Sequence, residues 1–188
     1  MEQQGCKGTR AGYSPVVMRM GPVTTIEGIA SADGTRPLLV EIQALAAKAG
    51  FGTPQRVATG YDGRKLALLL AVLDKRAGLS FAQLDVFLNV VGGVRMQEPA
   101  GDLAVAAALA SSVYDRIVPP DAVFIGEVGL GGEIRPVSQT DRRLAEAANM
   151  GMHRAYVAER AVPKRQPRDL QVVGVRNIAD LFARLFGG

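Results

Sequence analysis

Cysteine and histidine are almost missing from this sequence of 188 residues, which contains one copy of each, Cys6 and His153. A single cysteine cannot form a disulfide bond within the chain. A structural zinc site takes about four cysteine or histidine ligands, more than these two residues supply. The sequence therefore predicts no metal site, and its low cysteine content favours a reducing, cytoplasmic environment.

Long apolar runs are missing as well. No stretch approaches the roughly 18 apolar residues that a membrane-spanning helix needs, and residues 1–20 lack the continuous apolar region of a secretion signal. We therefore expect no contact with a membrane. Residues 1–20 show no hydrophobic period and are interrupted by glycine and proline, so we assign them as a tail or linker remnant and residues 21–188 as one domain.

Nucleotide-binding loops and a serine–histidine triad are not apparent either. No segment fits the G-x-x-x-x-G-K-[ST] loop that holds ATP phosphates, and Gly129–Ile134 has isoleucine where a dinucleotide-binding loop needs its third glycine. His153 follows a helix-ending glycine, a place more typical of a surface or packing residue than of a catalytic base. We expect no cofactor in this chain.

Alternating β-rich and helical segments fill the rest of the sequence. Strand patterns cover residues 23–30, 56–59, 85–91, 154–158 and 170–175, and helical patterns cover 62–77, 100–114, 140–150 and 177–186. Two short apolar runs around Gly129–Gly132 predict a glycine-tipped hairpin. Propensity does not separate strand from helix over residues 38–47. This order predicts a single α/β (α+β) domain with mixed sheets and packed helices.

Two blocks of sequence carry a resemblance to a known family. The first is NVVGGVR (89–95) with EPAGDLA (98–104), and the second is FIGEVGLGGEIRPV (124–137), with support from residues 36–45 and 64–75. From residue 23 to the end, the chain resembles the carboxy-terminal, Lon-protease-like domain of the bacterial DNA repair ATPases of the RadA (Sms) family. The resemblance implies a fold like the Lon proteolytic domain, of the type of ribosomal protein S5 domain 2.

The resemblance also implies a degenerate protease site. Lon-type proteases place their serine in a P-S-A-G-like turn, and Ala100 stands at that position here. Their lysine follows the second block, at or beside Asp141, with two arginines next. A serine–lysine dyad needs a hydroxyl and a neutral amine, whereas alanine has no nucleophile and arginine stays protonated. We therefore expect that this chain is not a peptidase and has no enzymatic activity of its own. A Lon-type ATP-dependent peptidase would need displaced groups such as Ser111, Ser112 or Ser138.

Members of this family assemble as hexamers on DNA and act in branch migration, with a zinc motif and a RecA-like ATPase core in their amino-terminal parts. The resemblance thus implies ATP, magnesium and zinc sites outside this chain, and a role as hexamer scaffold for it. The formal charge is +4. Nine basic residues are candidates for sequence-independent contacts with the backbone of single- or double-stranded DNA: Arg64, Lys65, Arg95, Arg135, Arg142, Arg143, Lys164, Arg165 and Arg168. A protein-interaction module without a DNA role is a further alternative.

Overall fold

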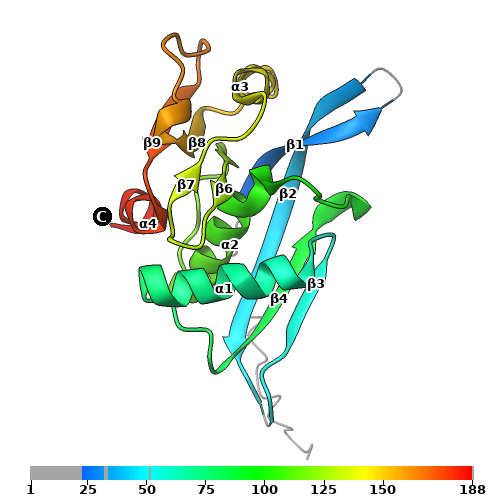
Figure 1. Cartoon of the computed structure of the whole chain (residues 1–188), viewed down its shortest axis with the longest axis vertical. Coiled ribbons are helices and arrows are strands. Elements are labelled where there is room, and N and C mark those ends of the chain that lie inside the picture. The colour runs from blue at the N-terminus through cyan, green and yellow to red at the C-terminus, as the bar shows by residue number, and fades with distance from the viewer. Residues whose placement is uncertain (1–22, 32–33, 51, 188) are drawn as a thin grey trace, which may run out of the picture.

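A computed structural model describes residues 23–31, 34–50 and 52–187. The tail assigned to residues 1–20 lies outside these ranges. In chain order the elements are β1 (Val23–Ser31), β2 (Gly34–Lys48), β3 (Arg56–Thr59), α1 (Gly63–Ala77), β4 (Leu84–Val90), α2 (Asp102–Tyr114), β5 (Ala122–Ile125), β6 (Glu127–Val128), β7 (Ile134–Arg135), α3 (Thr140–Asn149), β8 (Arg154–Ala158), β9 (Gln171–Val175) and α4 (Ile178–Phe186). They form a mixed α/β domain (Figure 1).

Seven strands form one mixed sheet in the order β3-β4-β2-β1-β5-β8-β9, and β6 and β7 form the predicted glycine-tipped hairpin. The long strand β2 connects two parts of the sheet. Up to Ile42 it pairs with β1, and from Ile42 onward it pairs with β4 on its other edge. Residues 38–47, ambiguous in the sequence, are therefore strand because they have strand partners. The pairs β1–β5, β5–β8 and β8–β9 are parallel.

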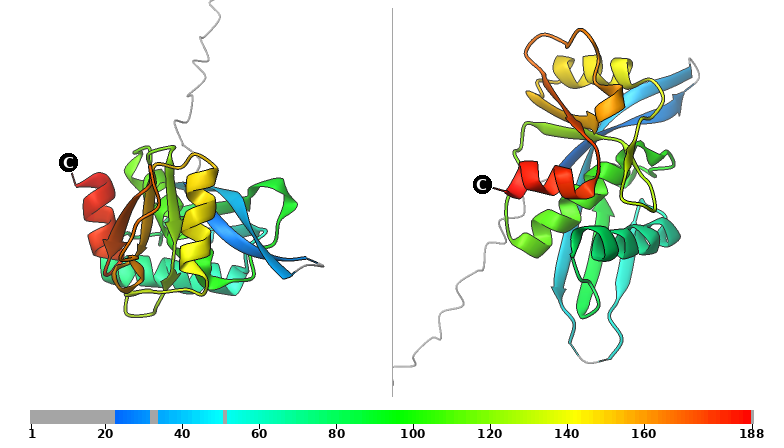
Figure 2. Two further views of the ribbon diagram at one scale, coloured as in Figure 1. Left: turned by 90° about the horizontal axis from the view of Figure 1, so that it is seen from above. Right: turned by 60° about the vertical axis from the view of Figure 1, so that its left-hand side comes forward.

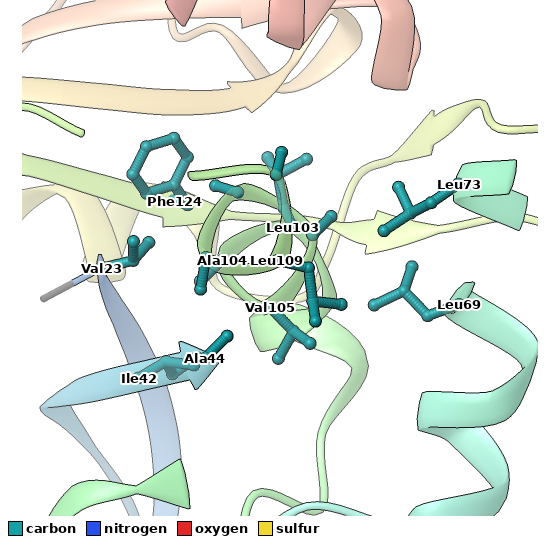
Figure 3. Close-up of a cluster of buried hydrophobic side chains, with 14 of the residues drawn as sticks. Val23, Ile42, Ala44, Leu69, Leu73, Leu103, Ala104, Val105, Leu109 and Phe124 are labelled. Carbon is teal, nitrogen blue, oxygen red and sulfur yellow. The ribbon is translucent and has the colours of Figure 1, made fainter. Parts of the chain in front are cut away.

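The helix α2 lies inside the main hydrophobic core, and every residue from Asp102 to Ser111 is buried. Figure 3 shows Leu103 and Leu109 of α2 between Phe124 of β5 and Leu69 and Leu73 of α1. The alanines of α2 allow strands and helices to approach it closely on all sides. A helix buried all round has no polar face, which explains why its sequence lacks a clear amphipathic pattern.

A second, smaller core covers the other face of β5, β8 and β9. There α3 packs Leu144 and Ala147 against Val123, Ile125 and Val157. In the left view of Figure 2, α3 and α4 lie on opposite sides of β8 and β9. These strands are covered on both faces, as is usual for parallel strands. No helix in the described part of the chain is long and apolar enough to cross a membrane.

Local signals predicted both ends of α1 and the cap of α4 correctly. Asp62 caps α1 by accepting the backbone N–H groups of Arg64 and Lys65, and Gly78 ends the helix in the left-handed conformation at φ 69°. Asn177 caps α4 in the same way, through the N–H of Asp180. α2 has no side-chain cap and begins at Asp102 rather than at the expected Ala100, because Pro99–Gly101 forms a 3-10 turn. The candidate site lies between the amino ends of α1 and α2.

Candidate functional site

The turn Pro99–Gly101 leads directly into α2, and its middle residue Ala100 is only 1% exposed. The N–H of Gly126 donates to the Ala100 carbonyl at 2.8 Å, and the N–H of Leu103 donates to the Gly126 carbonyl at 3.1 Å. These bonds fix the start of α2 against the end of β5. At Ala100, which the resemblance in the sequence compares with a protease serine, the chain therefore presents a buried methyl group.

Arg143 of α3 reaches the same region and is 3% exposed. Its guanidinium forms an ion pair with Glu98, two residues before Ala100, and donates through Nε to the Ser138 carbonyl at 3.0 Å. This pair joins α3 to the loop before α2. The structure thus corrects one expectation from the sequence, because a guanidinium buried in this way cannot reach DNA. Asp141 lies exposed in the first turn of α3.

A second polar cluster joins the first turns of α1 and α2. The Asp102 carboxylate accepts hydrogen bonds from Lys65 Nζ and from the Tyr61 hydroxyl, each at 2.8 Å. Lys65 Nζ also lies 5.3 Å from the centre of the Tyr61 ring. Burial raises the pKa of the Asp102 carboxyl, while the hydrogen bond and the positive charge of Lys65 oppose that rise.

Sequence reasoning missed the role of Asp102 and treated Lys65 only as a surface cation. The two residues are 37 positions apart and lie on different helices, so no spacing rule connects them. The only signal was the carboxylate within a run of apolar and small residues, Ala100–Ala110, because a charged side chain in such a run needs a partner when it is buried.

A hollow of about 590 Å³ opens beside this cluster. Lys65 and Arg95 both line it, together with Asp62 and Gln97. Gly60 holds its two walls together: the Met96 N–H donates to the Gly60 carbonyl at 2.8 Å, and a Cβ on Gly60 would lie 2.5 Å from the Val94 carbonyl oxygen. Arg95 is exposed and makes no hydrogen bond or ion pair with any residue that the structure describes.

The remaining basic candidates are spread over the surface. Arg135 of β7 is paired with Glu127 and Glu133, which offset its charge and raise its pKa, chiefly through the Glu133 hydrogen bond. Arg64 and Arg142 are exposed on α1 and α3. The other exposed candidates, Lys164, Arg165 and Arg168, lie in the β8–β9 loop, which is far from α1 along the long axis of the molecule (Figure 1). Of the nine candidates, the structure brings Lys65 and Arg95 to one hollow.

The described residues contain no group of three or more histidine, cysteine, aspartate or glutamate side chains placed to hold a metal ion. The polar residues that line the hollow carry one carboxylate, one amide, one phenol and two cationic side chains. Such a set suits an anionic guest better than a cation.

No protein-family model matches the chain. It is 51% identical over 148 residues to the DNA repair protein RadA of Escherichia coli (strain K12), 46% over 160 residues to that of Bacillus subtilis (strain 168), and 41% over 169 residues to that of Streptococcus pneumoniae. These matches cover 79%, 85% and 89% of this chain and 32%, 35% and 40% of the relatives. The chain thus spans about a third of the length of the curated relatives that it matches. The chain is therefore homologous to one segment of the bacterial DNA repair protein RadA.

Proposed function

We propose that this chain is the non-catalytic, Lon-like domain of a RadA-type DNA repair and recombination ATPase. In this proposal it serves as a hexamer scaffold and as a sequence-independent DNA-contacting module in branch migration. It has no enzymatic activity of its own, and ATP, magnesium and zinc are held by other parts of such a protein. The homology to a protein named for DNA repair supports this context.

The single observation that carries the non-catalytic part is the buried Ala100 methyl, two residues after the Glu98 that pairs with Arg143. A methyl group cannot attack a carbonyl, and a guanidinium cannot accept a proton at physiological pH. Lys65 is engaged as well, because its ammonium group donates to the Asp102 carboxylate. Two of the displaced serines are engaged: Ser111 donates to the Arg116 carbonyl at 2.6 Å, and Ser112 accepts the Ala46 N–H at 2.8 Å.

Neutral surface on the outer side of the sheet supports the scaffold part. Strands β3 and β4 expose Val57 at 44% and Phe87 at 37%, whereas α1 and α2 pack on the other face. A hollow of about 490 Å³ lies over this face, between Gln43, Leu45 and Asn89. Phosphate contacts need cations, so this face suits protein better than DNA. Leu130, 69% exposed at the hairpin tip, is a further contact candidate.

The test combines DNA binding and mass on the same samples. We expect labelled duplex DNA to bind to an oligomer, with an affinity that falls steeply as salt rises, because phosphate contacts release counterions. A fluorophosphonate probe, which labels nucleophilic serines, should leave the chain unmodified. Covalent labelling would favour a peptidase with displaced groups. A stable oligomer without DNA binding would favour the protein-interaction module.

A further inference from the structure

We infer that the hollow between Lys65 and Arg95 is a phosphate subsite in which Asp102 and the bound phosphate compete for the Lys65 ammonium group. Phosphate binding then draws Lys65 away from Asp102, and Asp102 takes up a proton from solvent. The inference deepens the DNA-contacting part of the proposed function and rests on it for the source of the phosphate.

Geometry places both cations at the same opening. Lys65 lies on the first turn of α1 and Arg95 in the segment that follows β4, and the hydrogen bond between Met96 and Gly60 holds these two segments together. The first N–H groups of α1 are already bonded to Asp62. A phosphate must therefore be bound by the side chains, and Arg95 offers a two-point donor with no partner in the described part of the chain.

Lys65 lies between the hollow and the buried Asp102 carboxylate. Its side chain is 34% exposed, so the ammonium group can face the hollow, while the Asp102 side chain is 8% exposed. An ammonium group has three donors, and one of them is bonded to the Asp102 carboxylate at 2.8 Å. A phosphate that attracts Lys65 leaves this carboxylate buried with the Tyr61 hydroxyl and the Val128 backbone N–H as its remaining donors.

A buried carboxylate that loses its counter-charge binds a proton more strongly. Burial already raises the pKa of Asp102, and the loss of Lys65 removes the main opposing influence. Binding of phosphate is therefore linked to uptake of up to one proton, and affinity should increase as the pH falls toward the raised pKa of Asp102. Asp62, the other carboxylate at the hollow, stays ionised, because its backbone hydrogen bonds lower its pKa.

The first experiment measures binding of a short labelled DNA duplex to wild type and to Arg95→Ala. We expect about a tenfold loss of affinity and a decrease of about one in the slope of log affinity against log salt. Arg160→Ala is the matched control, because Arg160 is an exposed arginine that lines a different hollow. If Arg160→Ala loses as much affinity as Arg95→Ala, the subsite is overturned.

The second experiment follows the same binding between about pH 5 and pH 8. Wild type should bind more tightly at the acidic end, and Asp102→Asn should lose this dependence and bind more tightly at neutral pH. His153→Gln controls for the one histidine, which lies away from the hollow beside the Asp169 carbonyl, and should keep the dependence. Lys65→Met should both weaken binding and remove the dependence, which provides a second reading if Asp102→Asn folds poorly. A dependence that persists in Lys65→Met overturns the coupling.

A third experiment measures tripolyphosphate binding through the amide chemical shifts near Arg95. It distinguishes the phosphate subsite itself from the proposal that DNA supplies the phosphate. Tripolyphosphate binding that needs Arg95, without DNA binding, would keep the subsite and reject the DNA part of the proposed function. DNA binding that does not change in Arg95→Ala and Lys65→Met would keep the proposed function and reject the subsite. Absence of both would reject both.

Discussion

The buried Arg143–Glu98 pair makes a quantitative prediction about stability. The change Glu98→Gln keeps the shape of the side chain but removes the counter-charge from a guanidinium that is 3% exposed. Removing one partner of a fully buried ion pair costs about 3–5 kcal/mol. The Glu98 side chain is 32% exposed, so water offsets part of this loss. We expect a decrease of about 2–3 kcal/mol in the free energy of unfolding, or roughly 5–10 °C in Tm.

The reverse change behaves differently because it removes the buried charge itself. Arg143→Met leaves Glu98 partly hydrated and fills a similar volume, so we expect a loss of about 1–2 kcal/mol. The double variant should cost about as much as Arg143→Met alone, which gives a coupling energy of about 2 kcal/mol.

Urea denaturation followed by circular dichroism measures these free energies, provided that the slope m is the same in all variants. Arg135→Met is the matched control: Arg135 also pairs with carboxylates, but on the surface, and we expect no measurable change. A coupling energy below about 0.5 kcal/mol would refute the reasoning, because it would mean that the pair contributes nothing beyond its separate side chains.

Three further predictions concern the neighbouring residues. Gly60→Ala should lower the free energy of unfolding by about 1–3 kcal/mol in urea denaturation, because φ is +77° and the new Cβ would meet the Val94 carbonyl; an unchanged midpoint would contradict this. Burial raises the pKa of Asp102, so its ionisation opposes folding: stability should fall as the pH rises through the raised pKa, and thermal melts should show that Asp102→Asn removes this fall. The double change Ala100→Ser with Asp141→Lys should give no cleavage of casein or of fluorogenic peptides, because position 100 is only 1% exposed and a serine there would be out of reach of a peptide; measurable turnover would show that the site is intact apart from those two residues.

The strand and helix pattern was largely predictable because local signals agree with the tertiary structure. The cap at Asp62 and the stop at Gly78 are properties of a few neighbouring residues, and they fixed α1 correctly. The strand state of residues 38–47 was not predictable, because it depends on pairing with β1 and β4. Of these two strands, β4 is distant along the chain.

The candidate site was less predictable than the fold. Arg143 was expected at the surface, although Arg143, Leu144 and Ala147 share the spacing of one helix face, and that face turned out to be the buried one. The pairing of Lys65 with Asp102 depends on how two helices meet, and a single sequence carries no direct signal for that. Counting charges therefore identified the cations, but not the carboxylates that pair with three of them, Lys65, Arg135 and Arg143.

The position of β1 beside β5 has a consequence for the order of folding. The Thr25 hydroxyl donates to the Phe124 carbonyl, 99 residues away in the chain, whereas β2, β3, α1 and β4 all fall between residues 34 and 90. Closing a long loop costs chain entropy before its contacts repay it, so the nearer elements should assemble first and the contact of β1 with β5 should form late. During synthesis, β1 leaves the ribosome about a hundred residues before β5, so the two strands cannot pair in that interval. In that interval its outer edge is open to wrong partners, and the chain depends on how quickly β5 follows.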